Sequence, residues 1–212
     1  MSDLAAVFES HAASNHWRNR ESVSGDGSTL DYTYNLRHEL TKFLAHFRVV
    51  SMFDAPCGDF NWMRAVEFPQ GFQYTGGDIV ASLVDANRAR YEAPGRHFER
   101  FDITSDPFPD ADLWFCRDCL FHLPSEKVLA ALRAFARSRI GYVMTTTHLN
   151  VTNFDNREVE PGGFRMLDLY KPPYSLPREV LFRIADYVHP YPARELCVWS
   201  RAQVAAALGE RG

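Results

Sequence analysis

Short apolar runs alternate with amphipathic segments through the middle of the chain. Runs rich in β-branched and aromatic residues predict strands over 48–54, 72–78, 96–102, 112–117 and 140–147. Helices are predicted between them over 60–67, 81–92 and 125–138. Such alternation of strand and helix is typical of an α/β fold, in which right-handed crossovers connect the strands of a parallel sheet.

The two ends of the chain depart from this alternation. The pattern predicts a short helix over 3–20, a flexible turn over 22–29 and a second helix over 32–47. Near the carboxyl end, L-F-R-I-A-D-Y-V and R-E-L-C-V-W-S-R predict two strands joined by H-P-Y-P-A. Residues 149–178 are rich in Asn, Gly and Pro and predict a long loop, which in a compact domain is usually functional.

These segments suggest one domain with four parts. Residues 1–47 would form a helical cap, 48–148 a ligand-binding core, 149–178 a substrate loop, and 179–212 a terminal hairpin and tail. A length of 212 residues fits one domain with a substantial hydrophobic core.

Composition and charge exclude several classes of protein. The net charge of −4 provides no basic field that would hold nucleic acid non-specifically. No apolar run approaches the ~20 residues of a transmembrane helix. The N-terminal sequence M-S-D-L-A-A-V-F-E-S lacks the basic end of a signal peptide, so a cytoplasmic location is expected.

Candidate chemistry begins where the first core strand ends. Asp54 closes an apolar run, and the chain then turns at once through Pro56, Cys57 and Gly58. This is how a parallel strand leads into a nucleotide-binding turn. The second strand ends in Asp78, and an acid about 20 residues past such a turn is placed to accept hydrogen bonds from ribose hydroxyls.

The turn differs from a dinucleotide-binding turn. Only Gly58 remains of the glycines that would let a pyrophosphate approach the backbone. Asp59 would repel a pyrophosphate. The turn therefore suits a nucleoside ligand without phosphates.

Four motifs resemble those of the class I S-adenosylmethionine-dependent methyltransferases. They are D-A-P-C-G-D-F-N-W-M (54–63), T-G-G-D-I (75–79), F-D-I-T (101–104) and D-L-W-F-C-R-D-C-L-F-H-L-P (112–124). The resemblance runs from about Ser24 to Trp199, although Pro56 and Phe60 stand where the family usually has glycines. It implies a Rossmann-like, mostly parallel seven-stranded sheet with helices on both faces, a terminal antiparallel hairpin, and S-adenosylmethionine as cofactor.

Within that family, the forms D-A-P-C-G-D-F and C-R-D-C-L-F-H-L-P are similar to a small bacterial branch. This branch includes enzymes that methylate saccharide hydroxyls, such as the methylmannose-polysaccharide methyltransferases of mycobacteria. The resemblance therefore implies an O-methyltransferase that takes a small saccharide or oligosaccharide, with a role in polysaccharide biosynthesis. A small-molecule N-methyltransferase and a non-catalytic methyltransferase-like partner protein are the alternatives. Oligomeric state stays open, with a homodimer as one option.

The resemblance also assigns cofactor-binding residues. Asp54, Ala55 and Gly58 would contact the methionine end, and Asp78 the ribose. Asp102 and Ile103 would bind the adenine, with Ile79 packed on its face.

The methionine carboxylate requires a cation or N–H donors. Arg37 is the first candidate and Arg117 is its rival. The turn S-G-D-G-S (24–28), together with Tyr32 and Tyr34, could close over the cofactor.

Transfer to a hydroxyl requires a base, because a protonated alcohol is a poor nucleophile. His148, after T-T-T at the end of a strand, is the preferred candidate. His122 lies in an apolar F-H-L-P context that is more typical of a core histidine. Asp118 could act as the base, orient a histidine or help to bind Mg²⁺.

The long loop predicts the acceptor site. Amide, guanidinium and phenol groups suited to a polyhydroxylated substrate come from Asn150, Asn153, Arg165 and Tyr170. Cys116 and Cys119 also raise a redox or zinc site as an alternative. That alternative is disfavoured, because no helix opens at this pair and no second cysteine pair completes a zinc site.

Overall fold

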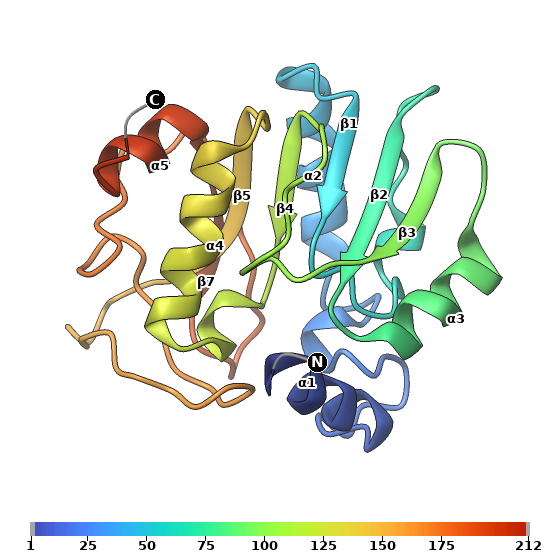
Figure 1. Cartoon of the computed structure of the whole chain (residues 1–212), viewed down its shortest axis with the longest axis horizontal. Coiled ribbons are helices and arrows are strands. Elements are labelled where there is room, and N and C mark those ends of the chain that lie inside the picture. The colour runs from blue at the N-terminus through green and yellow to red at the C-terminus, as the bar shows by residue number, and fades with distance from the viewer. Residues whose placement is uncertain (1–2, 211–212) are drawn as a thin grey trace.

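A single seven-stranded sheet forms the centre of the computed structural model, which describes residues 3–210 (Figure 1). The strands are β1 (Ser51–Asp54), β2 (Gln73–Asp78), β3 (Arg96–Arg100), β4 (Leu113–Cys116), β5 (Tyr142–His148), β6 (Phe182–Ala185) and β7 (Arg194–Ser200). Their order is β3-β2-β1-β4-β5-β7-β6. Strands β1 to β5 are parallel, whereas β7 is antiparallel to both β5 and β6. The predicted Rossmann-like α/β fold with a terminal antiparallel hairpin is confirmed.

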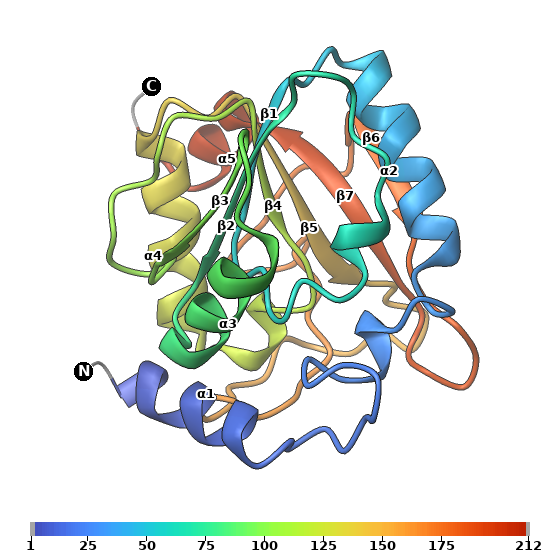
Figure 2. The ribbon, with the colours of Figure 1, turned by 90° about the vertical axis from the view of Figure 1, so that its right-hand side faces the viewer.

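Helices cover both faces of this sheet (Figure 2). They are α1 (Asp3–Ala13), α2 (Tyr34–His46), α3 (Ala81–Tyr91), α4 (Ser125–Arg137) and α5 (Arg201–Ala207). The apolar face of α2 packs in one buried cluster with side chains of β1, β5 and β7. Helices α4 and α5 contribute to a second buried cluster on the other face, around Trp114 and Trp199. Both faces of the sheet are therefore buried, which explains the nearly continuous apolar strands.

Three predicted elements differ from the structure. The helix predicted over 3–20 ends at Ala13, and Asn15 and Arg18 beyond it take positive φ angles of 46° and 55°, which a helix cannot accommodate. Only one 3₁₀ turn, Met63–Ala65, forms in the helix predicted over 60–67. The predicted tail contains α5, which begins with a capping box between Ser200 and Gln203.

Strand ends and the N-terminal segment converge at one edge of the sheet. In parallel strands the carboxyl ends share an edge, so Asp54, Asp78 and Cys116 end beside one another. Figure 1 shows α1 and the chain that follows it lying across this edge. No helix among residues 3–210 is long and apolar enough to cross a membrane.

Buried ion pairs join this edge to the terminal hairpin. The guanidinium of Arg117, just after β4, donates two hydrogen bonds to Asp186 at 2.8 and 3.0 Å. The side chains of Arg117 and Asp186 are only 4% and 1% exposed. Arg194 at the start of β7 donates two more to Asp118, at 3.0 and 2.8 Å. These bidentate pairs fix the end of β4 against β7 and the segment after β6.

We predict that Asp186→Ala lowers the free energy of unfolding by about 3 kcal/mol, because it leaves the buried Arg117 charge without its main partner. Urea denaturation followed by circular dichroism measures this change. Glu39→Ala is the matched control, since it removes an exposed ion pair with Lys42 and should change stability by less than about 0.5 kcal/mol. Equal, small changes for both variants would contradict a structural role for the buried pair.

Candidate active site

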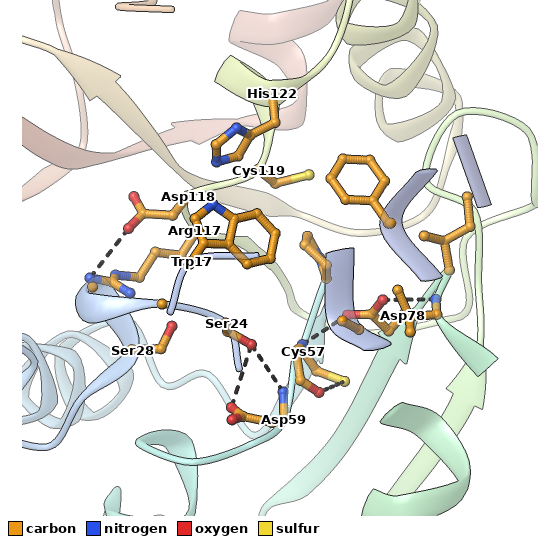
Figure 3. A pocket seen from close by; sticks show the side chains of 18 of the residues that line it. Trp17, Ser24, Ser28, Cys57, Asp59, Asp78, Arg117, Asp118, Cys119 and His122 are labelled. Atoms are coloured by element: carbon orange, nitrogen blue, oxygen red, sulfur yellow. Dashed lines mark hydrogen bonds and ion pairs between the residues drawn. The ribbon is translucent and has the colours of Figure 1, made fainter. Parts of the chain in front are cut away.

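A cavity of about 540 Å³ lies at the carboxyl edge of the sheet (Figure 3). Its walls come from the ends of β1, β2 and β4, from the chain after α1, and from the long loop. Figure 3 shows His122 and Asp118 toward one end of the cavity and Asp78 toward the other. The two ends differ in chemistry.

Asp78 is fixed at the end of β2 by the backbone around it. Its Oδ2 accepts a hydrogen bond from the Gly58 N–H at 2.9 Å, and its Oδ1 accepts one from Val80 at 3.0 Å. Burial raises the pKa of Asp78 to about 6, although these N–H donors oppose the rise. Each oxygen keeps a further lone pair, so this carboxylate can accept hydrogen bonds from a diol in the cavity.

Asp54 is the second buried acid of the cavity. Its Oδ2 accepts a hydrogen bond from the Tyr74 hydroxyl at 2.6 Å. Burial raises the pKa of Asp54 to about 8, and the nearby charge of Asp78 adds to the rise. The site would therefore favour a cationic ligand, which restores the charge that burial opposes.

Apolar side chains complete this half of the cavity. Ile79, Ile103 and Phe101 line it beside Asp102, whose Oδ1 accepts hydrogen bonds from Thr104 N–H at 2.9 Å and from the Thr104 hydroxyl at 2.7 Å. Ala55 follows Asp54 but is fully buried behind the wall, with its carbonyl accepting a hydrogen bond from the Trp114 indole. The structure therefore gathers the predicted cofactor residues at one end, with Ala55 as backbone support.

A strap formed by residues 21–33 roofs the cavity. Asp59 holds this strap, since its carboxylate accepts hydrogen bonds from the Ser22 hydroxyl and the Val23 N–H, both at 3.0 Å. Gly58 takes a φ of 55°, and a Cβ there would lie 2.4 Å from the Ser24 hydroxyl oxygen. The segment 22–29, predicted to be a flexible turn, is thus fixed by the turn after β1.

The strap contributes much of the lining of the cavity. The cavity is lined by Val23, Ser24, Gly25, Asp26, Gly27, Ser28 and Tyr32. Tyr34 does not take part, because its side chain is 75% exposed and lies outside the cavity.

The two candidate arginines have different positions. Arg37 does not line the cavity, because its guanidinium turns back to the Leu30 carbonyl at 2.9 Å and the Thr33 hydroxyl at 3.1 Å. The structure therefore gives Arg37 a local role and corrects the preference for it as a cofactor residue. Arg117 lines the cavity, although part of its guanidinium is bound to Asp186.

His122 is the candidate base that faces the cavity. Its Nδ1 lies 2.6 Å from the Gly163 carbonyl oxygen, which can only accept a hydrogen bond. The proton of the neutral ring is therefore on Nδ1, and Nε2 carries a free lone pair. Burial lowers the pKa of His122 below 6.5, so the ring is neutral at pH 7.

His148 lies outside this cavity. Its Nδ1 accepts a hydrogen bond from the Leu167 N–H at 3.1 Å, so the neutral ring carries its proton on Nε2 and has no free lone pair. Burial lowers the pKa of His148 to about 4. With Asn150 and Tyr170 it lines a separate cavity of about 160 Å³. The expectation that His148 faces the transferred methyl group is therefore not supported by its position.

Asp118 lines the main cavity as a carboxylate. Burial alone would raise the pKa of Asp118, but the charges of Arg117 and Arg194 outweigh it and lower the pKa. A carboxylate paired in this way is a weak base and leaves little room for a metal ion. Residues 3–210 contain no cluster of three or more His, Cys, Asp or Glu side chains that could hold one. The side chains present do not fit the Mg²⁺ alternative.

The loop residues predicted to bind substrate hold the loop together instead. Asn150 donates to the Phe154 carbonyl and to Asp168, and Asn153 accepts from Lys171. The Arg165 guanidinium donates a hydrogen bond to the Leu123 carbonyl, and the Tyr170 hydroxyl donates one to Glu195. None of these four predicted side chains lines the main cavity.

Further residues of the cavity were not among the predicted site residues. Gly162, Gly163 and Phe164 of the long loop line it, as do His16 and Trp17 after α1 and Arg194 of β7. The predicted helix over 3–20 placed Trp17 on a helix, and the two left-handed residues that turn it toward the cavity have no clear sequence signature. Cys119 also lines the cavity, and all four cysteines are free thiols.

The chain was compared with known proteins. Residues 53–139 match the model of a methyltransferase domain. N-methyltransferase NodS from Bradyrhizobium japonicum WM9, solved with S-adenosyl-L-homocysteine, superposes with a TM-score of 0.65 at 11% identity, covering 94% of this chain and 98% of NodS. No curated protein matched the chain.

Two further solved structures share the fold. Magnesium protoporphyrin IX methyltransferase (ChlM) from Synechocystis PCC 6803, with bound S-adenosylmethionine, gives a TM-score of 0.62 at 14% identity over 93% of this chain and 97% of ChlM. The methyltransferase domain of bacterial CtHen1-C gives a TM-score of 0.60 at 14% identity, covering 80% of this chain and 98% of that domain. Residues 53–139 thus match a methyltransferase domain, and the chain shares its fold with solved methyltransferases that bind S-adenosylmethionine or S-adenosyl-L-homocysteine.

The residues of the cavity fit this cofactor. Asp78 would present an anchored carboxylate to a ribose, Asp54 would favour a cation, and Gly58 leaves the turn without a side chain. Ile79 and Ile103 provide apolar surface for an adenine ring.

We predict that Asp78→Ala weakens binding of S-adenosyl-L-homocysteine by about 10- to 100-fold, because hydrogen bonds to a charged group contribute roughly 1.5–3 kcal/mol. Isothermal titration calorimetry measures this affinity. Asp85→Ala on the exposed side of α3 is the control and should bind normally. Unchanged affinity in Asp78→Ala would place the ribose elsewhere.

The affinity for S-adenosylmethionine should rise with pH between about 6 and 8. Asp54 is largely protonated in the free protein below its pKa of about 8, and a cationic ligand favours the ionised form, so binding releases a proton. The ionisation of Asp78, whose pKa is about 6, should contribute to the rise in affinity at the lower end of this pH range.

Calorimetry at pH 7 in two buffers of different ionisation enthalpy measures that proton release. Asp54→Asn should release fewer protons than the unmodified protein. Proton uptake on binding, or an affinity that falls over this range, would contradict the assignment of the cation to Asp54.

Proposed function

We propose that the protein transfers the methyl group of S-adenosylmethionine to a hydroxyl oxygen, and that the acceptor is a saccharide. The proposal depends on the His122 imidazole, whose Nδ1–H is bound by the Gly163 carbonyl and whose Nε2 is left as a base in the cavity. An alcohol requires such a base, whereas an amine with a free lone pair does not.

In this proposal, the side chains at the two ends of the cavity have different roles. The cofactor supplies a methyl carbon made electrophilic by the positive sulfur. Asp78 and Asp54 would hold and orient the cofactor, and His122 would accept the acceptor's hydroxyl proton at Nε2. The negative charge of Asp118 favours the protonated form of His122 and so would stabilise the imidazolium that results. Fixing both reactants in one cavity would supply much of the acceleration.

Support for a saccharide comes from the sequence motifs and from the cavity wall. The motifs resemble those of saccharide O-methyltransferases, as described above. The lining of the cavity combines aromatic rings with hydroxyl and carboxylate oxygens, including those of Ser28 and Asp118. Aromatic surface and oxygen acceptors together suit a polyhydroxylated ring. The predicted amide groups of the long loop give no support, because they face elsewhere.

The geometry of the cavity gives less support to the two alternative functions, a non-catalytic partner protein and an N-methyltransferase. A non-catalytic partner protein would not require Asp54, Gly58, Asp78 and Asp102 to line one cavity. N-methyl transfer would leave the orientation of His122 without a chemical role. The experiment below distinguishes N-methyl transfer from O-methyl transfer.

We predict that His122→Ala reduces turnover by about 10²- to 10⁴-fold, the usual loss for a positioned base. Affinity for S-adenosyl-L-homocysteine should be nearly unchanged, because His122 serves the acceptor. Transfer of radiolabelled methyl groups to a panel of sugars, phenols and amines measures turnover. For the unmodified enzyme, turnover should fall as the pH drops below 6.5, because His122 is neutral and active above its lowered pKa.

His148→Ala is the matched control, since it removes a buried histidine outside the main cavity, and a folded variant should retain most activity. Loss of turnover in His148→Ala alone would return the role of base to His148. Methyl transfer to amines only, unaffected by His122→Ala, would favour the N-methyltransferase.

A further inference from the structure

Two aromatic side chains from outside the β4–α4 connection lie near His122. The ring centroids of Trp17 and His122 are 5.9 Å apart, and those of Phe164 and His122 are 6.3 Å apart. All three residues line the main cavity. Trp17 comes from the chain after α1 and Phe164 from the long loop, so two segments far apart in sequence supply rings beside the candidate base.

The backbone at both rings is shaped by glycines. Gly25 of the strap has a φ of 93°, and a Cβ there would lie 3.1 Å from Cβ of Trp17, so the strap can pass directly over this residue only because position 25 lacks a side chain. Gly162 has a φ of 80°, and its neighbour Gly163 binds His122 through its carbonyl. The turn that presents Phe164 is therefore the turn that sets the His122 tautomer.

Neither ring is explained by the hydrophobic core. Phe164 is 57% exposed, and Trp17 is only half-buried. Trp17 is held edge-on by His11 and His16, with ring centroids 5.4 and 5.5 Å away, so its position is fixed although part of its surface stays accessible. Fixed aromatic surface that is left exposed at the mouth of a cavity is typical of a binding site.

We propose that Trp17 and Phe164 form the specificity-determining subsite for the acceptor, and that they hold the apolar C–H face of a sugar ring beside Nε2 of His122. This proposal rests on the proposed function. The negative faces of aromatic rings attract polarised C–H groups, and a flat indole offers a large contact area with little conformational freedom to lose. A cyclic acceptor presents such a face, whereas an open-chain polyol with the same hydroxyl groups does not.

With this subsite, the enzyme should select cyclic acceptors over open-chain acceptors. Methyl glucopyranoside and sorbitol are the two probes, because both present several hydroxyl groups and only the first has a rigid ring. Trp17→Ala and Phe164→Ala should each raise KM for the pyranoside about five- to tenfold, the loss expected for one aromatic contact. The kcat for the pyranoside, KM for sorbitol and affinity for S-adenosyl-L-homocysteine should change less than twofold.

Two further variants control for misfolding and for generic effects. Trp17→Phe retains a ring and should restore most of the pyranoside KM even if Trp17→Ala disturbs the strap. Tyr34→Ala removes an aromatic side chain that is 75% exposed outside the cavity, and it should change nothing. Equal effects of Trp17→Ala and Phe164→Ala on both probes, or no effect on either, would overturn the proposal.

A binding measurement separates this proposal from the proposed function. With S-adenosyl-L-homocysteine bound, methyl glucopyranoside should change the tryptophan fluorescence of the unmodified protein, and Trp17→Phe should abolish the change. This result would support the subsite even if no methyl transfer to hydroxyls were found, in which case the proposed function alone would fail. The same fluorescence change in Trp17→Phe, or none in the unmodified protein at saturating pyranoside, would contradict the subsite.

Discussion

Four charged side chains at the end of β4 constrain most of the active-site geometry. Arg117 and Asp118 follow this strand directly, and each is paired with a residue of the terminal hairpin region, Asp186 or Arg194. Because each arginine makes two hydrogen bonds to one carboxylate, the pairs fix direction as well as distance. The rings of Tyr32 and Trp62 lie against Arg117, so the strap is fixed to the same cluster. The network thereby fixes Arg117, Asp118, Arg194 and Tyr32, all of which line the cavity.

The pKa values of the acids are shifted in opposite directions at the two ends of the cavity. At the cofactor end, burial raises the pKa values of Asp54 and Asp78, so these acids gain by meeting a cation or hydrogen-bond donors. Around His122, the charges of Arg117 and Arg194 keep Asp118 ionised beside a neutral imidazole. This difference would allow one small cavity to bind a cationic cofactor and also to accept a proton from a hydroxyl group.

The sequence predicted the fold, and it predicted that Asp54, Gly58, Asp78 and Asp102 would gather at one edge of the sheet, because both depend on local patterns. Strand ends such as Asp54 and Asp78 follow directly from the alternation of strands and helices and from the spacing of their acids. The half of the cavity around His122, the proposed acceptor half, depends on loops, where long-range hydrogen bonds decide which side chains face inward. Asn150 and Arg165 look like ligand-binding groups in the sequence, yet they donate to backbone carbonyls, Asn150 to Phe154 within the loop and Arg165 to Leu123 before α4. His122 and His148 could be ranked only after their hydrogen-bond partners were known.

The tautomers of these two histidines test the assignment of His122 as the base most directly. Long-range ¹H–¹⁵N correlation spectra of the ¹⁵N-labelled protein at pH 7 distinguish a protonated ring nitrogen from one with a free lone pair, and the variants His122→Ala and His148→Ala assign the signals. We predict that His122 carries its proton on Nδ1 and has a free Nε2, whereas His148 carries its proton on Nε2. A His122 ring protonated on Nε2, or doubly protonated at this pH, would contradict its role as the base.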